Sequence, residues 1–162
     1  MNLPDVLNDP VAQELLNSRE LARFGYTWTD GSPRVVPVWF HWTGSEIVVA
    51  SPDKAPKLRA LSTGAKVALT IDTSNWPHHV LMVRGTAKVE PVDGVVPEYA
   101  AAAERYFGPD QGRAWVDQLR QAGAKMKRIG ITPTAARLMD FETRFPSAIA
   151  ALLGTGSGPA QA

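Results

Sequence analysis

The feature that most constrains the fold is a series of five short β-capable segments, which follow one another between residues 21 and 90. Turns rich in glycine, proline, aspartate and serine separate several of these segments. Closely spaced strands with such turns are typical of small antiparallel barrels. Gly85, inside the last segment, predicts a bulge or a bend that lets a barrel close. The predicted strands are residues 21–29, 34–42, 47–51, 66–72 and 80–90.

The remaining segments predict helices around this barrel and a sixth strand. Residues 9–18 have the spacing of a short amphipathic helix, and residues 52–64 predict a second helix with a basic start and a glycine stop. Two alanine-rich helices are expected within residues 95–126, broken at the sequence GPDQG. Residues 128–142 return to strand character, with Pro133 at an edge or an interruption. The predicted fold class is therefore mainly β with flanking helices, α+β, built on a six-stranded antiparallel barrel.

The length and charge of the chain limit its organisation and its partners. A chain of 162 residues fits one domain, which we place at residues 1–145, followed by a tail at residues 146–162. The end of that tail, GTGSGPAQA, is expected to be disordered. A net charge of +1 gives no reason to expect nucleic acid or an anionic membrane as a partner. Neither a signal-peptide pattern nor a long apolar window is present, so a cytoplasmic protein is expected.

Two short motifs carry functional information. The first is a strand that opens with Arg34 and continues as an apolar Val-Pro-Val segment. The second is a hydroxyl residue at the end of a strand, Ser51, followed six positions later by Lys57 in the predicted helix. Lysines at a helix start suit an anion such as phosphate, because the helix dipole favours negative charge there. On composition alone, Arg34, Lys54, Lys57 and Arg59 are more often a solvated basic face.

These motifs, in this order of elements, resemble the pyridoxamine 5′-phosphate oxidase-related superfamily of FMN-binding split β-barrels. The resemblance covers about residues 10–142. It implies a split barrel that forms a homodimer, with the cofactor between the subunits and with each chain contributing to both sites. A strand that is apolar on both faces then has something to bury on each side, the barrel core on one face and the cofactor or partner chain on the other.

The resemblance also assigns roles to individual residues. Arg34, Ser51, Lys54 and Lys57 would hold the FMN phosphate, and residues 36–39 would lie along the edge of the flavin ring, with their backbone groups facing it. Pro37 fits such a place, since a strand position that faces a ligand need not donate to the ladder. The Trp39 and Trp42 side chains are more often core or interface residues. The implied cofactor-binding residues are thus Arg34, Val36, Pro37, Val38, Trp39, Ser51, Lys54 and Lys57.

Some departures from the family pattern bear on substrate and cofactor. The chain has no C-terminal segment rich in Trp, Arg and His, which disfavours vitamin B6 oxidation. The glutamine that many members place near the fifth strand falls around His79 and Val80, and Pro56 precedes the lysine of the phosphate motif. A branch of the same barrel that binds the deazaflavin coenzyme F-420 shares the PVWF and KLRAL sequences, so F-420 is the alternative cofactor to FMN.

Two hypotheses about function follow. The sequence has no cysteine, its three histidines form neither a helical metal pair nor a catalytic triad, and no side chain is indicated as a general base or nucleophile. Enzymes that transfer hydride leave the chemistry to the cofactor. The first hypothesis is a flavin- or deazaflavin-dependent oxidoreductase that acts by hydride transfer on a small organic substrate. The alternative is a non-catalytic cofactor or ligand carrier on the same scaffold.

Overall fold

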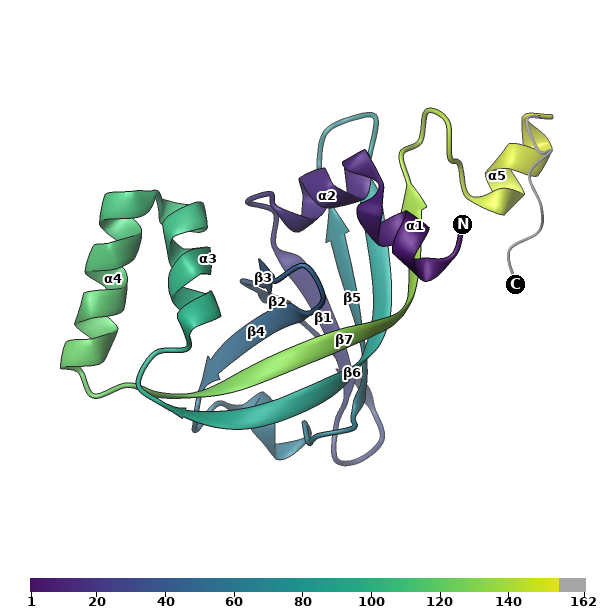
Figure 1. Ribbon diagram of the computed structural model, residues 1–162. Helices are drawn as coiled ribbons and strands as arrows, with labels where there is room; N and C mark the ends of the chain where they lie inside the picture. The colour runs from purple at the N-terminus through teal and green to yellow at the C-terminus, as the bar shows by residue number, and fades with distance from the viewer. Residues whose placement is uncertain (155–162) are drawn as a thin grey trace.

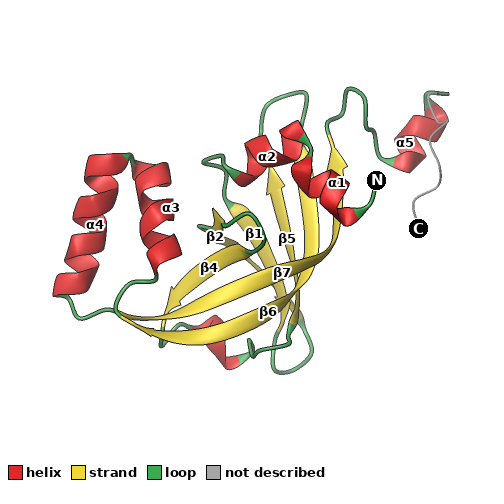
Figure 2. Cartoon of the chain, viewed as in Figure 1, coloured by secondary structure: helices red, strands yellow, loops and turns green. Residues whose placement is uncertain are grey.

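The computed structural model describes residues 1–154, and it centres on one antiparallel sheet that curls into a barrel (Figures 1 and 2). The strand order is β2-β1-β5-β6-β7-β4-β3. This confirms a mainly β fold with flanking helices, although the sheet has seven strands instead of the predicted six. The strands are β1 Ala22–Thr27, β2 Pro33–Val38, β3 His41–Trp42, β4 Ile47–Pro52, β5 Lys66–Asp72, β6 Val80–Asp93 and β7 Lys125–Met139.

The extra strand arises because the segment 34–42, predicted as one strand, is divided. Its first part is β2, which pairs with β1 at one edge of the sheet, and its last part is β3, which pairs with β4 at the other edge. Trp39 and Phe40 lie between the two strands, and the Phe40 side chain is buried in the core with 1% of its surface exposed. This corner therefore joins the two edges of the sheet and closes the barrel.

The prediction of a bulge at Gly85 is confirmed. The register of β6 and β7 shifts between Arg84 and Gly85, and Gly85 lies opposite Pro133, which is the interruption expected at that proline. A Cβ atom on Gly85 would collide with the carbonyl oxygen of Thr132. The two longest strands pair along their whole length, and at this bulge only glycine allows their backbones to come so close.

Two short helices cover one end of the barrel (Figure 1). They are α1 Leu3–Asn8 and α2 Pro10–Leu16, and only the second was predicted. Asp9 lies between them and caps α2 by accepting a hydrogen bond from the backbone N–H of Val11 at 2.9 Å. Leu15 and Leu16 of α2 are fully buried in the barrel core, which fixes the helix over the open end.

The predicted helix at residues 52–64 is much shorter than expected. Only Pro56–Arg59 is helical, as the four-residue 3-10 helix η1. Proline favours the first turn of a helix and restricts the residue before it to extended backbone, so Pro56 sets a late start. Gly64, with φ of 91°, occurs in the turn before β5. The dipole of so short a helix adds little to anion binding, and this part of the prediction is wrong.

The two alanine-rich helices form a hairpin beside the barrel, on the side of β3 and β4 (Figure 1). They are α3 Pro97–Phe107 and α4 Pro109–Gln121, and they meet at Gly108. The sequence GPDQG was expected to separate the two helices, but only its first glycine does so, and the other four residues are part of α4. The last helix, α5 Ser147–Leu152, lies within the predicted tail. Most of the segment expected to be disordered, residues 155–162, lies outside the described residues.

Candidate functional site

The strand of the first motif and the short helix of the second meet at Trp28, where η1 follows β4. Arg34 extends from β2, and Arg59 extends from η1, and each guanidinium carbon lies 5.7 Å from the centre of the Trp28 ring. Trp28 therefore brings together the strand of the first motif and the helix of the second. Neither Trp28 nor Arg59 was among the predicted binding residues, although both occur in the sequence close to residues that were.

Ser51 and Lys57 lack polar partners. Ser51 is 1% exposed and lies on the same face of β4 as the core residues Ile47 and Val49. Among residues 1–154, no hydrogen-bond partner meets its Oγ atom. Lys57 is partly buried, and burial lowers the pKa of its ammonium group. No carboxylate of the described chain lies within 4.0 Å of Lys57, so the positive charge is desolvated without compensation.

The other two predicted phosphate residues lie at the surface. Lys54 and Arg34 are both exposed. Hydrogen bonds from Ser32 lower the pKa of the nearby Asp30 carboxyl, and the positive charge of Arg34 lowers it further. The structure thus brings Arg34 near the η1 helix that carries Lys57, and it leaves Lys54 on the rim in the loop before η1.

Residues 36–39 lie at the open edge of the sheet. Val36 and Val38 pack against the core, whereas Val35 is 67% exposed and Pro37 also faces outwards. Among the strands described, β2 pairs only with β1, so the other side of its backbone is available to a ligand. Pro37 lies in this edge strand, where its missing N–H costs no hydrogen bond to a second strand.

The Trp39 side chain turns away from this edge towards α3. Its ring stacks on Tyr106 with centroids 5.0 Å apart and planes at 11°, and it also contacts Tyr99 and Phe107 at 5.5 and 4.9 Å. The ring of Trp39 is therefore engaged by the helical hairpin. Only the backbone of Trp39 remains for the cofactor role that the resemblance assigned to it.

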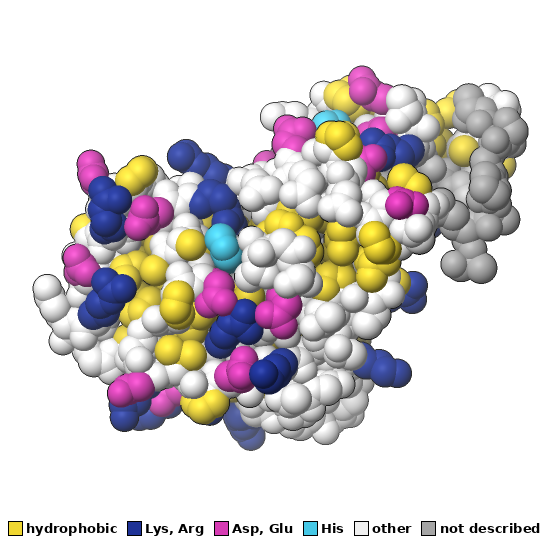
Figure 3. Space-filling view, viewed as in Figure 1, with side chains coloured by type: hydrophobic (Ala, Val, Ile, Leu, Met, Phe, Trp, Pro, Cys, Tyr) yellow, Lys and Arg dark blue, Asp and Glu magenta, His cyan; other side chains and the backbone are white. Residues whose placement is uncertain are grey.

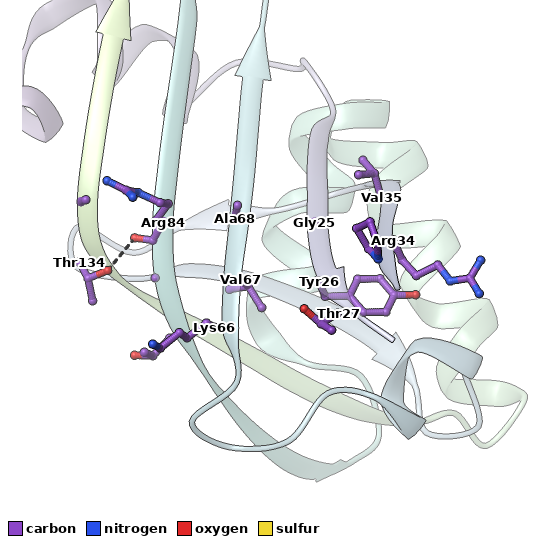
Figure 4. Close-up of a pocket in the computed structure, with 14 residues that line it drawn as sticks. Gly25, Tyr26, Thr27, Arg34, Val35, Lys66, Val67, Ala68, Arg84 and Thr134 are labelled. Atoms are coloured by element: carbon purple, nitrogen blue, oxygen red, sulfur yellow. Dashed lines mark hydrogen bonds between the residues drawn. The ribbon is translucent and has the colours of Figure 1, made fainter. Parts of the chain in front are cut away.

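A groove of about 690 Å³ runs over the outer face of the sheet (Figure 4). Small residues, Gly25 of β1 and Ala68 of β5, contribute to its floor, and Lys66 and Arg84 contribute positive charge. Arg34 lines one end, which connects the groove with the motif residues. A Cβ atom on Gly25 would meet nothing closer than 3.5 Å, so the fold itself does not require this glycine. A glycine inside a strand often marks the close approach of a ligand or another backbone.

Charged groups on the opposite side of the barrel are paired. Arg128 of β7 meets Glu98 of α3 at 2.8 Å, Glu46 at 2.9 Å and Glu90 at 3.6 Å. Burial opposes the charge of Glu98, but the hydrogen bond and the positive charge of Arg128, together with a backbone hydrogen bond, outweigh burial and lower the pKa of that carboxyl. Basic and acidic side chains lie side by side on this face in Figure 3. The network holds α3 against the barrel.

A second paired cluster organises the turn after β7. The Asp140 carboxylate is 5% exposed and accepts hydrogen bonds from the backbone N–H groups of Glu142, Thr143 and Arg144. The Arg144 guanidinium also bonds to Asp140 at 2.8 Å and to Asp9 at 2.6 Å. Burial favours the neutral acid, but the hydrogen bonds from Thr143 and Arg144 hold the pKa of Asp140 well below its usual range. This cluster ties the C-terminal turn to α2.

No arrangement of three or more His, Asp or Glu side chains in residues 1–154 could hold a metal ion. Within the same residues, no helix has the length and apolar character needed to cross a membrane.

Comparison with known proteins places the fold. The sequence profile described as pyridoxamine 5′-phosphate oxidase matches residues 9–140. A solved structure named F420 reductase is 24% identical, with a TM-score of 0.59 over 77% of this chain and 94% of its own. A conserved hypothetical protein from Mycobacterium tuberculosis is 19% identical, with a TM-score of 0.64 over 100% of this chain and 98% of its own.

A third similar structure is HutZ, the heme storage protein from Vibrio cholerae, which is 17% identical, with a TM-score of 0.57 over 86% of this chain and 95% of its own. None of the curated proteins matches the chain. Likeness at these identities concerns the fold, whereas the sequence profile spans most of the barrel. From the strand order, the two motifs and this match, the chain belongs to the pyridoxamine 5′-phosphate oxidase family.

Proposed function

We propose that the protein is an oxidoreductase that binds FMN or the deazaflavin F-420 and acts by hydride transfer on a small organic substrate. The observation that carries this proposal is that two groups lack partners, the buried Ser51 hydroxyl at the end of β4 and the partly buried, unpaired Lys57 in η1. Burying such groups costs stability unless a ligand compensates them. A phosphate ester is an anion that accepts hydrogen bonds from both.

The residues around this pair fit the rest of such a cofactor. Arg34 and Arg59, both positioned on Trp28, would add positive charge beside the phosphate. The free backbone edge of β2, at Val36, Pro37 and Val38, offers main-chain groups to the polar rim of a flavin ring. A bound flavin or deazaflavin supplies the hydride chemistry, and the protein supplies binding, orientation and exclusion of water. Similarity to an F420 reductase supports this reaction class.

The proposal includes a homodimer with the cofactor between the subunits. A second chain would cover the exposed Val35 and the groove over Gly25. Gly25→Val tests this, because the sheet has room for a first side-chain atom whereas the groove would be filled. We expect the variant to fold and to shift towards monomer in analytical ultracentrifugation. An unchanged dimer with Val at this position, or a monomeric native protein, would contradict this arrangement.

The experiment that tests the function is a spectroscopic titration of the purified protein with FMN and with F-420. We expect one of them to bind, with a shifted absorption band, and to be reduced by NADPH or another hydride donor and then reoxidised by an added acceptor. A protein that takes up neither cofactor would refute the proposal. A protein that binds one but never exchanges hydride would leave the carrier hypothesis, a role for which HutZ offers a structural precedent.

A further inference from the structure

Arg105 of α3 reaches from the helical hairpin into the barrel and bonds to two distant carbonyl groups. Its Nε atom donates to the carbonyl oxygen of Ser18 at 2.8 Å, and its Nη2 atom donates to the carbonyl oxygen of Phe40. The guanidinium also lies 5.0 Å from the centres of the Phe40 and Tyr106 rings. No carboxylate of residues 1–154 lies within 4.0 Å of this arginine.

The two carbonyl groups lie before and after the β1–β2 hairpin. Ser18 precedes β1, and Phe40 follows β2 in the corner that closes the barrel. Tyr106 reinforces the first contact, because its hydroxyl donates to the carbonyl oxygen of Glu20 at 2.8 Å. The stack of Trp39 on Tyr106 reinforces the second. Helix α3 thus holds both ends of the hairpin that carries the open edge of β2.

These contacts determine where that edge lies. Val38 pairs with Ala22 and is two residues from the carbonyl that Arg105 binds. A shift of the Phe40 backbone would therefore move Val38 and its free main-chain groups. Hydrogen bonds from a charged donor are stronger and more directional than those between neutral groups, so an arginine defines this position better than an apolar contact would.

We propose that Arg105 is a positioning residue for the cofactor edge, which fixes the backbone of residues 36–40 against the ring of the bound flavin or deazaflavin. This inference rests on the proposed function. Arg105 acts on the ring end of the site, whereas Lys57 and Ser51 act on the phosphate end, and the two contributions to affinity are therefore separable.

A comparison of FMN with riboflavin, which has the same ring and no phosphate, separates them. Arg105→Ala should lower the affinity for FMN and the affinity for riboflavin by the same factor, on the order of tenfold, so that the ratio of the two affinities stays at the wild-type value. Lys57→Ala should lower the affinity for FMN and leave the affinity for riboflavin unchanged, so that the ratio of the FMN affinity to the riboflavin affinity falls. If F-420 is the ligand bound, the same pair of variants is compared with F-420 and its phosphate-free ring fragment.

The controls address folding and surface charge. Arg105→Lys keeps the positive charge but has a single nitrogen to reach the two carbonyl groups, so it should recover part of the lost affinity. If Arg105→Ala does not fold, Tyr106→Phe takes its place, because it removes only the hydroxyl that bonds to Glu20. Arg113→Ala on the exposed side of α4, where Arg113 pairs with Asp110 and Glu104, should leave both affinities unchanged. A fall in the FMN affinity alone, or no change in either ligand for Arg105→Ala, would overturn the proposal.

Amide hydrogen exchange in the ligand-free protein tests the same contact without a cofactor. Exchange at residues 36 and 38–40, which carry amide hydrogens, should accelerate in Arg105→Ala on the order of tenfold, with the β6–β7 ladder unaffected. Failure of wild-type protein to bind any flavin or deazaflavin would refute the proposed function and, with it, the cofactor role of Arg105. Unchanged exchange at residues 36–40, in a protein that binds its cofactor, would refute the positioning role alone.

Discussion

The two sides of the barrel use arginine and lysine in opposite ways. On the side of β4, β7 and α3, Arg128 is surrounded by three glutamates, and beyond the other end of β7 the Arg144 guanidinium is shared by two aspartates. At the end of the barrel formed by β2 and η1, Arg34, Lys57 and Arg59 have no carboxylate within 4.0 Å among the residues described. Paired charges hold elements together, and unpaired charges that are partly desolvated remain available to an anion.

Removal of Arg128 should give the largest effect on stability. Arg128→Ala leaves Glu46, Glu90 and Glu98 close together without a cation, and we expect it to cost about 3 kcal/mol of unfolding free energy. Urea denaturation followed by far-UV circular dichroism measures this. Arg120→Ala, which breaks an exposed pair with Asp117, is the matched control and should cost about 0.5 kcal/mol or less. Equal losses in the two variants would show that the network does not hold α3.

Asp140 should contribute the second largest effect. Asp140→Asn removes the negative charge and replaces with a donor group the oxygen that accepts from the Thr143 hydroxyl and the Arg144 guanidinium, and we expect a loss of about 2 kcal/mol at neutral pH. The pKa of Asp140 is lowered in the folded state, so its contribution is complete above the ordinary carboxyl pKa of about 4 and is lost as the pH falls below it. The wild-type protein should therefore lose stability in acid more steeply than Asp140→Asn, and parallel curves would contradict this.

The effect of Lys57 should be on cofactor affinity. Lys57→Ala removes a charge-assisted contact to the phosphate, and we expect a loss of about 1.5–3 kcal/mol in binding free energy, measured by fluorescence titration. Lys54→Ala, on the exposed rim of the same loop, should lose less. An Ala variant at position 57 with wild-type affinity would show that the phosphate lies elsewhere.

The smallest expected effect concerns alkaline pH. Burial lowers the pKa of Lys57, so in the ligand-free protein this ammonium group should lose its proton at a lower pH than an ordinary lysine. The affinity ratio of FMN to riboflavin should therefore decline as the pH rises through that lowered pKa, because only the charged form binds phosphate strongly. Lys57→Arg should keep the ratio constant over the same range. A decline that is identical in both proteins would exclude Lys57 as its cause.

The barrel could be predicted from the sequence because its signals are local. Short β-capable segments and turn residues indicate antiparallel strands, Gly85 predicts a bulge or a bend, and Pro133 predicts an edge or an interruption of its strand, and the two residues lie opposite each other at the bulge. The division of residues 34–42 could not be predicted in the same way. The segment is apolar on both faces, so its pattern does not show that the chain leaves one sheet edge at Trp39 and joins the other at His41.

The candidate site was predictable where a motif carried it, as for Arg34, Ser51 and Lys57. Trp28 and Arg105 were missed for different reasons. Trp28 acts through ring contacts with two arginines from separate elements, and such contacts leave no fixed spacing in the sequence. Arg105 bonds to carbonyl groups 65 and 87 residues away, so its role depends wholly on tertiary packing. Every residue has a main-chain carbonyl acceptor, so the amino-acid type does not show which carbonyl groups an arginine will bind.

The open edge of β2 has a consequence for the protein before it meets any ligand or partner. An unpaired strand edge is a template on which another chain can add a strand, and such edges promote aggregation. Pro37 lies within this edge strand, and its backbone has no N–H to offer to an incoming strand. The same residue that suits a cofactor edge thus protects the newly made chain from joining its neighbours edge to edge.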